Sequence, residues 1–172
     1  MADSLNDSFI QQINQNLGIA HKVARLYFTE WDDRDDILQE MMYQLWRSYK
    51  GFDGRSKFST WMYSVCLNTA LTYRRKDKKK KNESLSHTHY QIANPPVENK
   101  DEAIQLLFAV IAKLPPVNKA IVLLHLEKMT YEEIAVITGL SKSNVSVRLV
   151  RIKKDLEVEM KKKFKSKEDV NF

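Results

Sequence analysis

Residues 142–156 carry amide, hydroxyl and cationic side chains at intervals that place them along one side of a helix. Together with one valine, they are Ser143, Asn144, Val147, Arg148, Arg151 and Lys154. Apolar residues recur at helical spacing on the opposite side: Val145, Leu149, Ile152 and Leu156. Amide and guanidinium groups hydrogen-bond base edges and phosphate oxygens, so such an outward face suits the DNA major groove. The alternative is a plain helical hairpin with a solvated basic face.

The preceding residues predict a second, shorter helix and a tight turn before this one. Thr130 is a good N-cap and Glu133 follows three residues later, which is the pairing of a capping box. Gly139 supplies the left-handed residue that ends the helix, and Ser141 caps the next helix. The buried face of the short helix is expected at Ile134, Ala135 and Ile137. The whole segment 130–156 therefore predicts a helix-turn-helix.

The net charge of +6 is unevenly distributed along the chain. Residues 61–100 carry eight basic and three acidic side chains, a balance of +5. Most of this excess lies in the run from Arg74 to Lys81. Such a tract adds phosphate affinity without reading sequence, and it is also typical of a solvated linker.

Composition narrows the class of protein and of site. The 172 residues are 43% hydrophobic, enough for one large or two small domains. They contain no apolar run long enough to insert in a membrane and no N-terminal signal pattern. The single cysteine, Cys66, forms no internal disulfide and fits a reducing cytoplasm. We expect no metal site and no cofactor, because His87, His89 and Cys66 lack further ligands at tight spacing.

Apolar periodicity predicts an all-α fold of two small helical domains. Three amphipathic helices are expected before residue 82, at Phe9–Tyr27, Ile37–Tyr49 and Phe58–Tyr73. Their apolar faces are predicted at Phe9, Ile13, Leu17, Ala20, Ala24 and Tyr27, then at Ile37, Leu38, Met41, Met42, Leu45, Trp46 and Tyr49, and then at Phe58, Trp61, Met62, Val65, Cys66, Thr69 and Tyr73. Residues 82–101 are polar, contain two adjacent prolines and predict a flexible linker. Helices at 102–113 and 117–128 follow, separated by Pro115 and Pro116. The predicted divisions are a first domain at 1–81, the linker, a helix-turn-helix domain at 102–165 and a tail at 166–172.

The two halves together resemble an extracytoplasmic-function (ECF) sigma factor of bacterial RNA polymerase, in the sigma-70 family. In the first half the resemblance rests on Asp36, Gln39, Glu40 and Trp46, then on the run from Phe58 to Tyr63 and on Asn68, Ala70, Tyr73, Arg74 and Arg75. In the second half it rests on Leu114-Pro115-Pro116, Glu133-Ile134-Ala135, Gly139-Leu140-Ser141, Val145 and Arg148-Leu149. The segment SKSNVSVR, residues 141–148, resembles the corresponding segment in the Bacteroidetes branch of the family. Thr72 stands where many members have Asp, and no role is assigned to it.

The resemblance implies that the first domain docks on core RNA polymerase. Asp36, Gln39 and Glu40 share one short stretch of helix and correspond to the family's contact with the clamp helices of the largest subunit. Taken without the resemblance, the same three residues read as an ordinary solvated face.

The resemblance also implies two contacts with promoter DNA. The loop 52–57 and the helix after it resemble the segment that melts the minus-ten element, with candidates Phe52, Arg55, Ser56, Lys57, Phe58, Asn68, Arg74 and Arg75. Aromatics, polar groups and cations together can hold an unstacked base. Trp61 fits a core position as well as a DNA contact. On the last helix, Ser143, Asn144 and Val147 are expected to reach base edges of the minus-thirty-five element, and Arg148, Arg151 and Lys154 to meet phosphates.

The expected function is that of a sigma factor, which binds core polymerase, directs it to promoters and helps to open the minus-ten element. The expected partners are core RNA polymerase, promoter DNA and an anti-sigma factor. A stand-alone dimeric helix-turn-helix regulator is the alternative, but it would leave the aromatic and basic loop of the first domain unexplained. A nucleic-acid enzyme is not expected, because no paired carboxylates or metal cluster are placed for catalysis.

Overall fold

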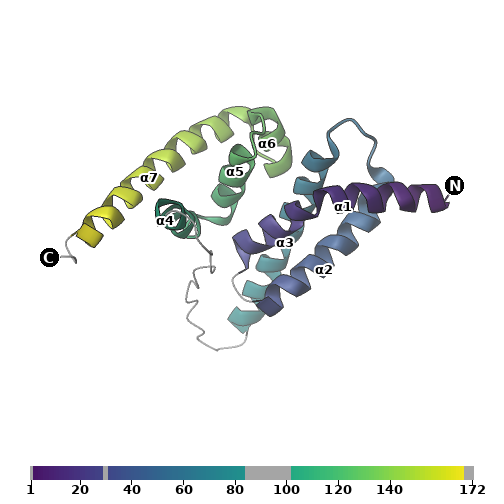
Figure 1. The fold of residues 1–172 in the computed structure, drawn as a ribbon, viewed down its shortest axis with the longest axis horizontal. Helices are drawn as coiled ribbons and strands as arrows, with labels where there is room; N and C mark the ends of the chain where they lie inside the picture. Colours follow the sequence, from purple (N-terminus) through teal and green to yellow (C-terminus); the bar gives the residue numbers. More distant parts are fainter. Residues whose placement is uncertain (1, 29–30, 84–101, 169–172) are drawn as a thin grey trace. The chain divides into compact units, whose positions relative to one another are not determined.

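The computed structural model describes residues 2–28, 31–83 and 102–168, and the chain divides into two compact units at residues 93 and 94. The described residues form seven α-helices and one 3-10 turn, with no strand among them (Figure 1). The predicted all-α fold of two helical domains is therefore confirmed. No helix in this part of the chain has both the length and the apolar character needed to span a bilayer.

The first unit is a three-helix arrangement of α1 (Ala2–Tyr27), α2 (Trp31–Ser48) and α3 (Phe58–Glu83), with the 3-10 turn η1 (Tyr49–Gly51) after α2. Each helix packs against the other two (Figure 1). The side chains that α1, α2 and α3 bury completely or nearly so include Val23, Ile37, Met41, Leu45, Met62 and Leu67. Burial of these apolar surfaces fixes the outer faces of α2 and α3 that carry the candidate site residues.

The second unit consists of α4 (Glu102–Ile111), α5 (Pro116–Leu126), α6 (Tyr131–Thr138) and the long α7 (Lys142–Glu168). Helix α7 packs against the other three helices of this unit. Pro115 is the N-cap of α5 and Pro116 is its first residue, where a missing N–H costs nothing. The predicted stripe of α7 forms the core contact, since Val145, Leu149 and Ile152 are buried and Leu156 is half-buried.

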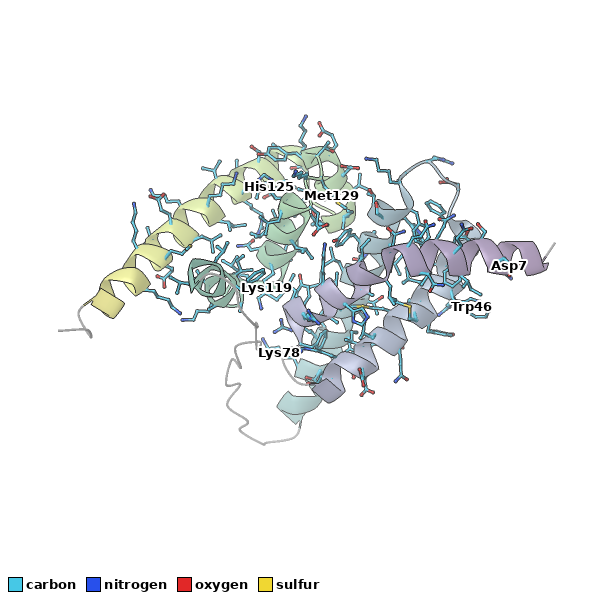
Figure 2. The ribbon with its side chains drawn as sticks, viewed as in Figure 1. Asp7, Trp46, Lys78, Lys119, His125 and Met129 are labelled. Carbon is cyan, nitrogen blue, oxygen red and sulfur yellow. The ribbon has the colours of Figure 1, made fainter. Side chains whose placement is uncertain are left out.

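Several predicted positions differ from the structure. Trp46 is predicted on the apolar face of its helix, but its side chain is 58% exposed and projects from α2 (Figure 2). On α3 the buried face is rotated towards Tyr63 and Leu67, which the predicted pattern omitted. The reason is that α3 packs against both α1 and α2, which widens the face it buries. Leu17, predicted on the core face of α1, is 39% exposed.

Two helices continue past the predicted domain limits. Helix α3 continues through residues 82 and 83, two residues into the predicted linker. Helix α7 continues to Glu168, into the predicted tail. Most of the predicted linker, including His87 and His89, and the end of the tail lie outside the described residues. Within the described residues there is no cluster of His, Cys, Asp and Glu that could hold a metal ion. Cys66 is buried in the first unit, and this burial raises the pKa of its thiol to about 12.

Candidate nucleic-acid interface

The turn between α6 and α7 has the geometry that its sequence predicts. The Thr130 backbone N–H donates to Glu133 Oε2 at 2.8 Å, and the Glu133 backbone N–H donates to Thr130 Oγ1 at 3.2 Å, which completes the capping box. Gly139 has a φ of 71°, a left-handed conformation that a residue with a Cβ adopts at a cost. The Asn144 backbone N–H donates to Ser141 Oγ at 3.2 Å, so Ser141 caps α7 as expected.

An ion pair across the turn adds a further constraint between the two helices. The Lys142 ammonium at the start of α7 contacts the Glu132 carboxylate in the first turn of α6. The hydrogen bond from Lys142 lowers the pKa of Glu132, although both side chains are more than half exposed. A pair this exposed stabilises the turn only weakly. The capping box, the glycine and the apolar stripe of α7 therefore set the angle at which α7 is presented.

The outward face of α7 holds the predicted minus-thirty-five residues. Ser143, Asn144, Arg151 and Lys154 are exposed, and Val147 is 49% exposed. Sequence reasoning missed Val150, which lies on the same face one turn after Val147 and is 68% exposed. The signal that could have identified Val150 is an apolar side chain on an otherwise polar outer face. Two exposed valines here can contact thymine methyl groups, as apolar side chains do in the major groove.

Arg148 lies differently from the other predicted DNA contacts of this helix. Its side chain is half-buried, and its Nε–H donates to Asn144 Oδ1 at 2.9 Å within α7. Its Nη1 donates to Asn118 Oδ1 on α5 at 3.2 Å. Arg148 is predicted to meet a phosphate, and in the structure two of its three nitrogen atoms donate to protein groups.

In the first unit, the loop between η1 and α3 exposes the predicted cations. Arg55, Ser56 and Lys57 are all exposed. The Arg55 guanidinium pairs with Asp53, with 2.7 Å between Nε and Oδ2, and the Arg55 backbone N–H donates to Asp53 Oδ1 at 3.1 Å. Gly54 between them has a φ of 74°, which closes this tight loop. The loop therefore presents its cations in a defined turn beside the aromatic residues that flank it.

Aromatic rings from four segments (α1, η1, the loop and α3) gather here, and we call Phe9, Tyr49, Phe52, Phe58 and Trp61 the aromatic cluster. Trp61 lies 5.1 Å from Phe52 and 5.2 Å from Phe58, between ring centroids. Tyr49 lies 4.9 Å from Phe9 of α1, so the cluster reaches the first helix. All five rings are half-buried. Phe52 and Phe58 are thus walls of one apolar surface, and Trp61 combines packing with partial exposure.

The remaining candidates on α3 fall on different sides of the helix. Asn68 and Arg75 are exposed and seven residues apart, which places them on one side about 10 Å apart. Asn68 is about 15 Å along the helix from Phe58, so the structure does not bring it to the loop. Arg74 faces α1 instead, with its Cζ 5.9 Å from the Tyr27 ring centroid in a cation–π contact. The two adjacent arginines, predicted to act together, therefore point in directions about 100° apart around α3.

The predicted polymerase-docking residues lie together on α2. Asp36 and Gln39 are exposed, whereas Glu40 is half-buried and its Oε1 accepts a hydrogen bond from Gln44 Nε2 at 2.8 Å. Burial and then the negative charges of Asp36 and Asp33 raise the pKa of Tyr73 on α3. Tyr43, 52% exposed, follows one turn later on the same side, and Trp46 is one turn beyond.

Both units match known families. Residues 12–80 match Sigma-70 region 2, and residues 104–156 match Sigma-70 region 4. The chain is 30% identical over 183 residues to the ECF RNA polymerase sigma-E factor of Haemophilus influenzae, covering 91% of this chain and 96% of that relative. The chain belongs to the ECF family of RNA polymerase sigma factors. It is also 30% identical over 154 residues, 80% of each chain, to the sigma-E factor of Escherichia coli K12.

Solved structures share the fold of this ECF sigma factor. The sigma factor RpoE of Bartonella quintana, solved with the anti-sigma factor NepR, superposes with a TM-score of 0.78 and 20% identity, over 90% of this chain and 97% of that one. CnrH, solved with the cytosolic domain of CnrY, gives a TM-score of 0.61 and 20% identity, over 89% and 87% of the two chains. At this identity the likeness concerns the fold.

Membership in the family settles the class of function. This ECF sigma factor binds core RNA polymerase, directs it to specific promoters and helps to melt the minus-ten element. Sigma factors regulate initiation and are not themselves known as enzymes. The match of the first unit to region 2 accounts for the part of the chain that a stand-alone dimeric regulator left unexplained.

Proposed function

We propose a division of labour among named residues of this ECF sigma factor. Asp36, Gln39 and Glu40 dock on core polymerase, the loop 52–57 and the outer side of α3 open the minus-ten element, and α7 reads the minus-thirty-five element. The observation that carries the proposal is the aromatic cluster beside an exposed cationic loop, because strand opening needs a stacking surface close to phosphate-binding groups. The protein acts in the cytoplasm and catalyses no reaction itself.

The docking surface consists of Asp36, Gln39, Glu40, Tyr43 and Trp46 in this proposal. The polar residues supply charge complementarity to a basic partner surface, which favours fast and specific encounter. The two exposed aromatic side chains supply the desolvated anchors that dominate binding energy in many interfaces. In the family the partner is the pair of clamp helices of the largest polymerase subunit.

For opening, we propose that an unstacked minus-ten base is held against the aromatic cluster. Arg55 and Lys57 then neutralise the nearby phosphates, and Ser56 supplies a polar contact in the same loop. Asn68 and Arg75 continue the contact along α3, since they are exposed on one side of it. Arg74 supports α1 through Tyr27 rather than the DNA.

An anti-sigma factor is the proposed regulator. The support is that the two structural neighbours were solved with NepR, an anti-sigma factor, and with the cytosolic domain of CnrY. Exposed Tyr43 and Trp46 give such a partner an apolar surface to cover, in competition with polymerase.

The docking assignment is tested with Asp36→Ala, Gln39→Ala and Glu40→Ala combined, measured as affinity for core RNA polymerase in a titration. Removing three adjacent contacts should weaken assembly at least tenfold, since each hydrogen bond to a charged group contributes about 1.5–3 kcal/mol. The matched control combines Asp7→Ala, Gln11→Ala and Gln15→Ala, three exposed residues spaced along α1. Equal affinities of the two triple variants for core RNA polymerase would contradict the assignment of this docking site.

A further inference from the structure

Asn118 and Arg148 form a contact between α5 and α7 that joins residues thirty positions apart in the sequence. Asn118 follows the proline-capped start of α5, whereas Arg148 lies in the second turn of α7. Arg148 also bonds Asn144, one turn earlier on α7. The three side chains thus make a continuous hydrogen-bonded chain, from Asn118 through Arg148 to Asn144, that ends on the DNA-reading face.

The chemistry of the guanidinium fixes how both amides are turned. A guanidinium has only donors, so each asparagine must present its oxygen to Arg148. The Asn144 oxygen is therefore directed along α7 towards Arg148. Its Nδ2 group, with two N–H donors, is the part of the amide left for DNA, and Asn144 is exposed.

We propose that Asn118 is a positioning residue for minus-thirty-five recognition: it anchors Arg148, and Arg148 holds Asn144 with its amide N–H groups towards the base edges. This inference rests on the proposed role of α7. In the major groove, purine N7, guanine O6 and thymine O4 accept hydrogen bonds, whereas cytosine offers an amino donor. An Asn144 held in this way accepts A, G or T at the contacted position and discriminates against cytosine.

The contact serves orientation more than stability, because Asn144 is exposed and the other two side chains are only half-buried. Hydrogen bonds that water can replace contribute little to folding. Without the anchor, the Asn144 amide rotates freely and presents its oxygen as often as its N–H groups, so cytosine becomes acceptable. Loss of Asn118 should therefore change base preference while the fold persists.

The test uses the full-length protein in holoenzyme with core RNA polymerase, selected on promoter fragments with a randomised minus-thirty-five element. Asn118→Ala should reduce discrimination against cytosine at one position by roughly two- to tenfold, the range of one hydrogen bond. Asn118→Asp keeps an acceptor for Arg148 and should restore the wild-type profile. Asn144→Ala should lose the preference at the same position, and thermal unfolding of each variant shows whether the fold persists.

The outcomes separate this inference from the proposed function beneath it. An Asn118→Ala profile identical to wild type, with an altered Asn144→Ala profile, would overturn the positioning role and leave the assignment of α7 intact. An Asn118→Asp variant that behaves like Asn118→Ala would also overturn it, because the acceptor would then be irrelevant. An unchanged Asn144→Ala profile would overturn the assignment of Asn144 itself.

Discussion

The two regions of this ECF sigma factor that we propose to contact DNA are built on different principles. The helix-turn-helix is specified locally, by a capping box, a left-handed glycine and an apolar stripe within 27 residues. The opening region instead gathers rings from α1, η1, the loop and α3, from Phe9 to Trp61. A helix that reads duplex DNA needs a rigid polar face, whereas a region that captures an unpaired base needs apolar surface that stays accessible.

The largest effect is expected from removing the apolar core beneath α7. Leu149 is 2% exposed, so Leu149→Ala should lower the free energy of unfolding of the second unit by about 2–5 kcal/mol. Minus-thirty-five-dependent binding should fall with it. Leu126→Ala is the matched control, since Leu126 is 56% exposed and its truncation should cost within about 0.5 kcal/mol. Thermal unfolding followed by circular dichroism measures both, and equal shifts would contradict the assigned core.

A second experiment separates reading from anchoring on α7. Asn144→Ala should cost about 1–3 kcal/mol on the preferred minus-thirty-five sequence and blur base preference there. Lys154→Ala should weaken all sequences alike and lower the salt slope by roughly one phosphate contact. Both variants are compared over a randomised library at several salt concentrations. A Lys154 variant with altered base preference and an unaltered salt slope would contradict the phosphate-contact role of Lys154 and assign it to base reading.

Variants of the proposed opening region should affect strand separation and spare binding to duplex DNA. Shortening the loop at residues 55–57, or Asn68→Ala at a cost of about 1 kcal/mol, should reduce melting and leave closed-complex binding unchanged. Permanganate footprinting detects the unpaired bases, and a template with a pre-opened bubble should restore transcription. Asn14→Ala, which removes an exposed amide from α1, is the control. A bubble that gives no rescue would show that these residues act at another step.

The smallest expected effect is a pH dependence of the free energy of unfolding of the second unit. Burial and then the charge of Lys153 lower the pKa of His125 from its usual 6.5. The unfolded state therefore binds the proton first as pH falls below about 6.5, so the free energy of unfolding decreases there and is unaffected at higher pH. His125→Gln should flatten this dependence in urea unfolding from pH 5 to 8, with His21→Gln as the control. A slope that His125→Gln leaves unchanged would assign the effect to other groups.

Sequence reasoning succeeded where one stretch of chain contains all the partners of an interaction. The capping box needs residues three apart, and Gly139 needs only its own missing Cβ. The predicted apolar faces of the helices were less accurate at their edges. Trp46 fits the apolar period of α2 yet is 58% exposed, because a period fixes the direction of a face but not its width.

By itself, the sequence determined the all-α fold, most helix limits, the helix-turn-helix and membership in the sigma-70 family. Only the tertiary structure decided which flanking residues are covered and which distant residues meet. It directed Arg74 to Tyr27 while Arg75 remained exposed, and it joined Asn118 to Arg148 across thirty residues. The physical reason is that local hydrogen bonds and periodicity act over one or two turns, whereas these choices depend on how separate helices pack together.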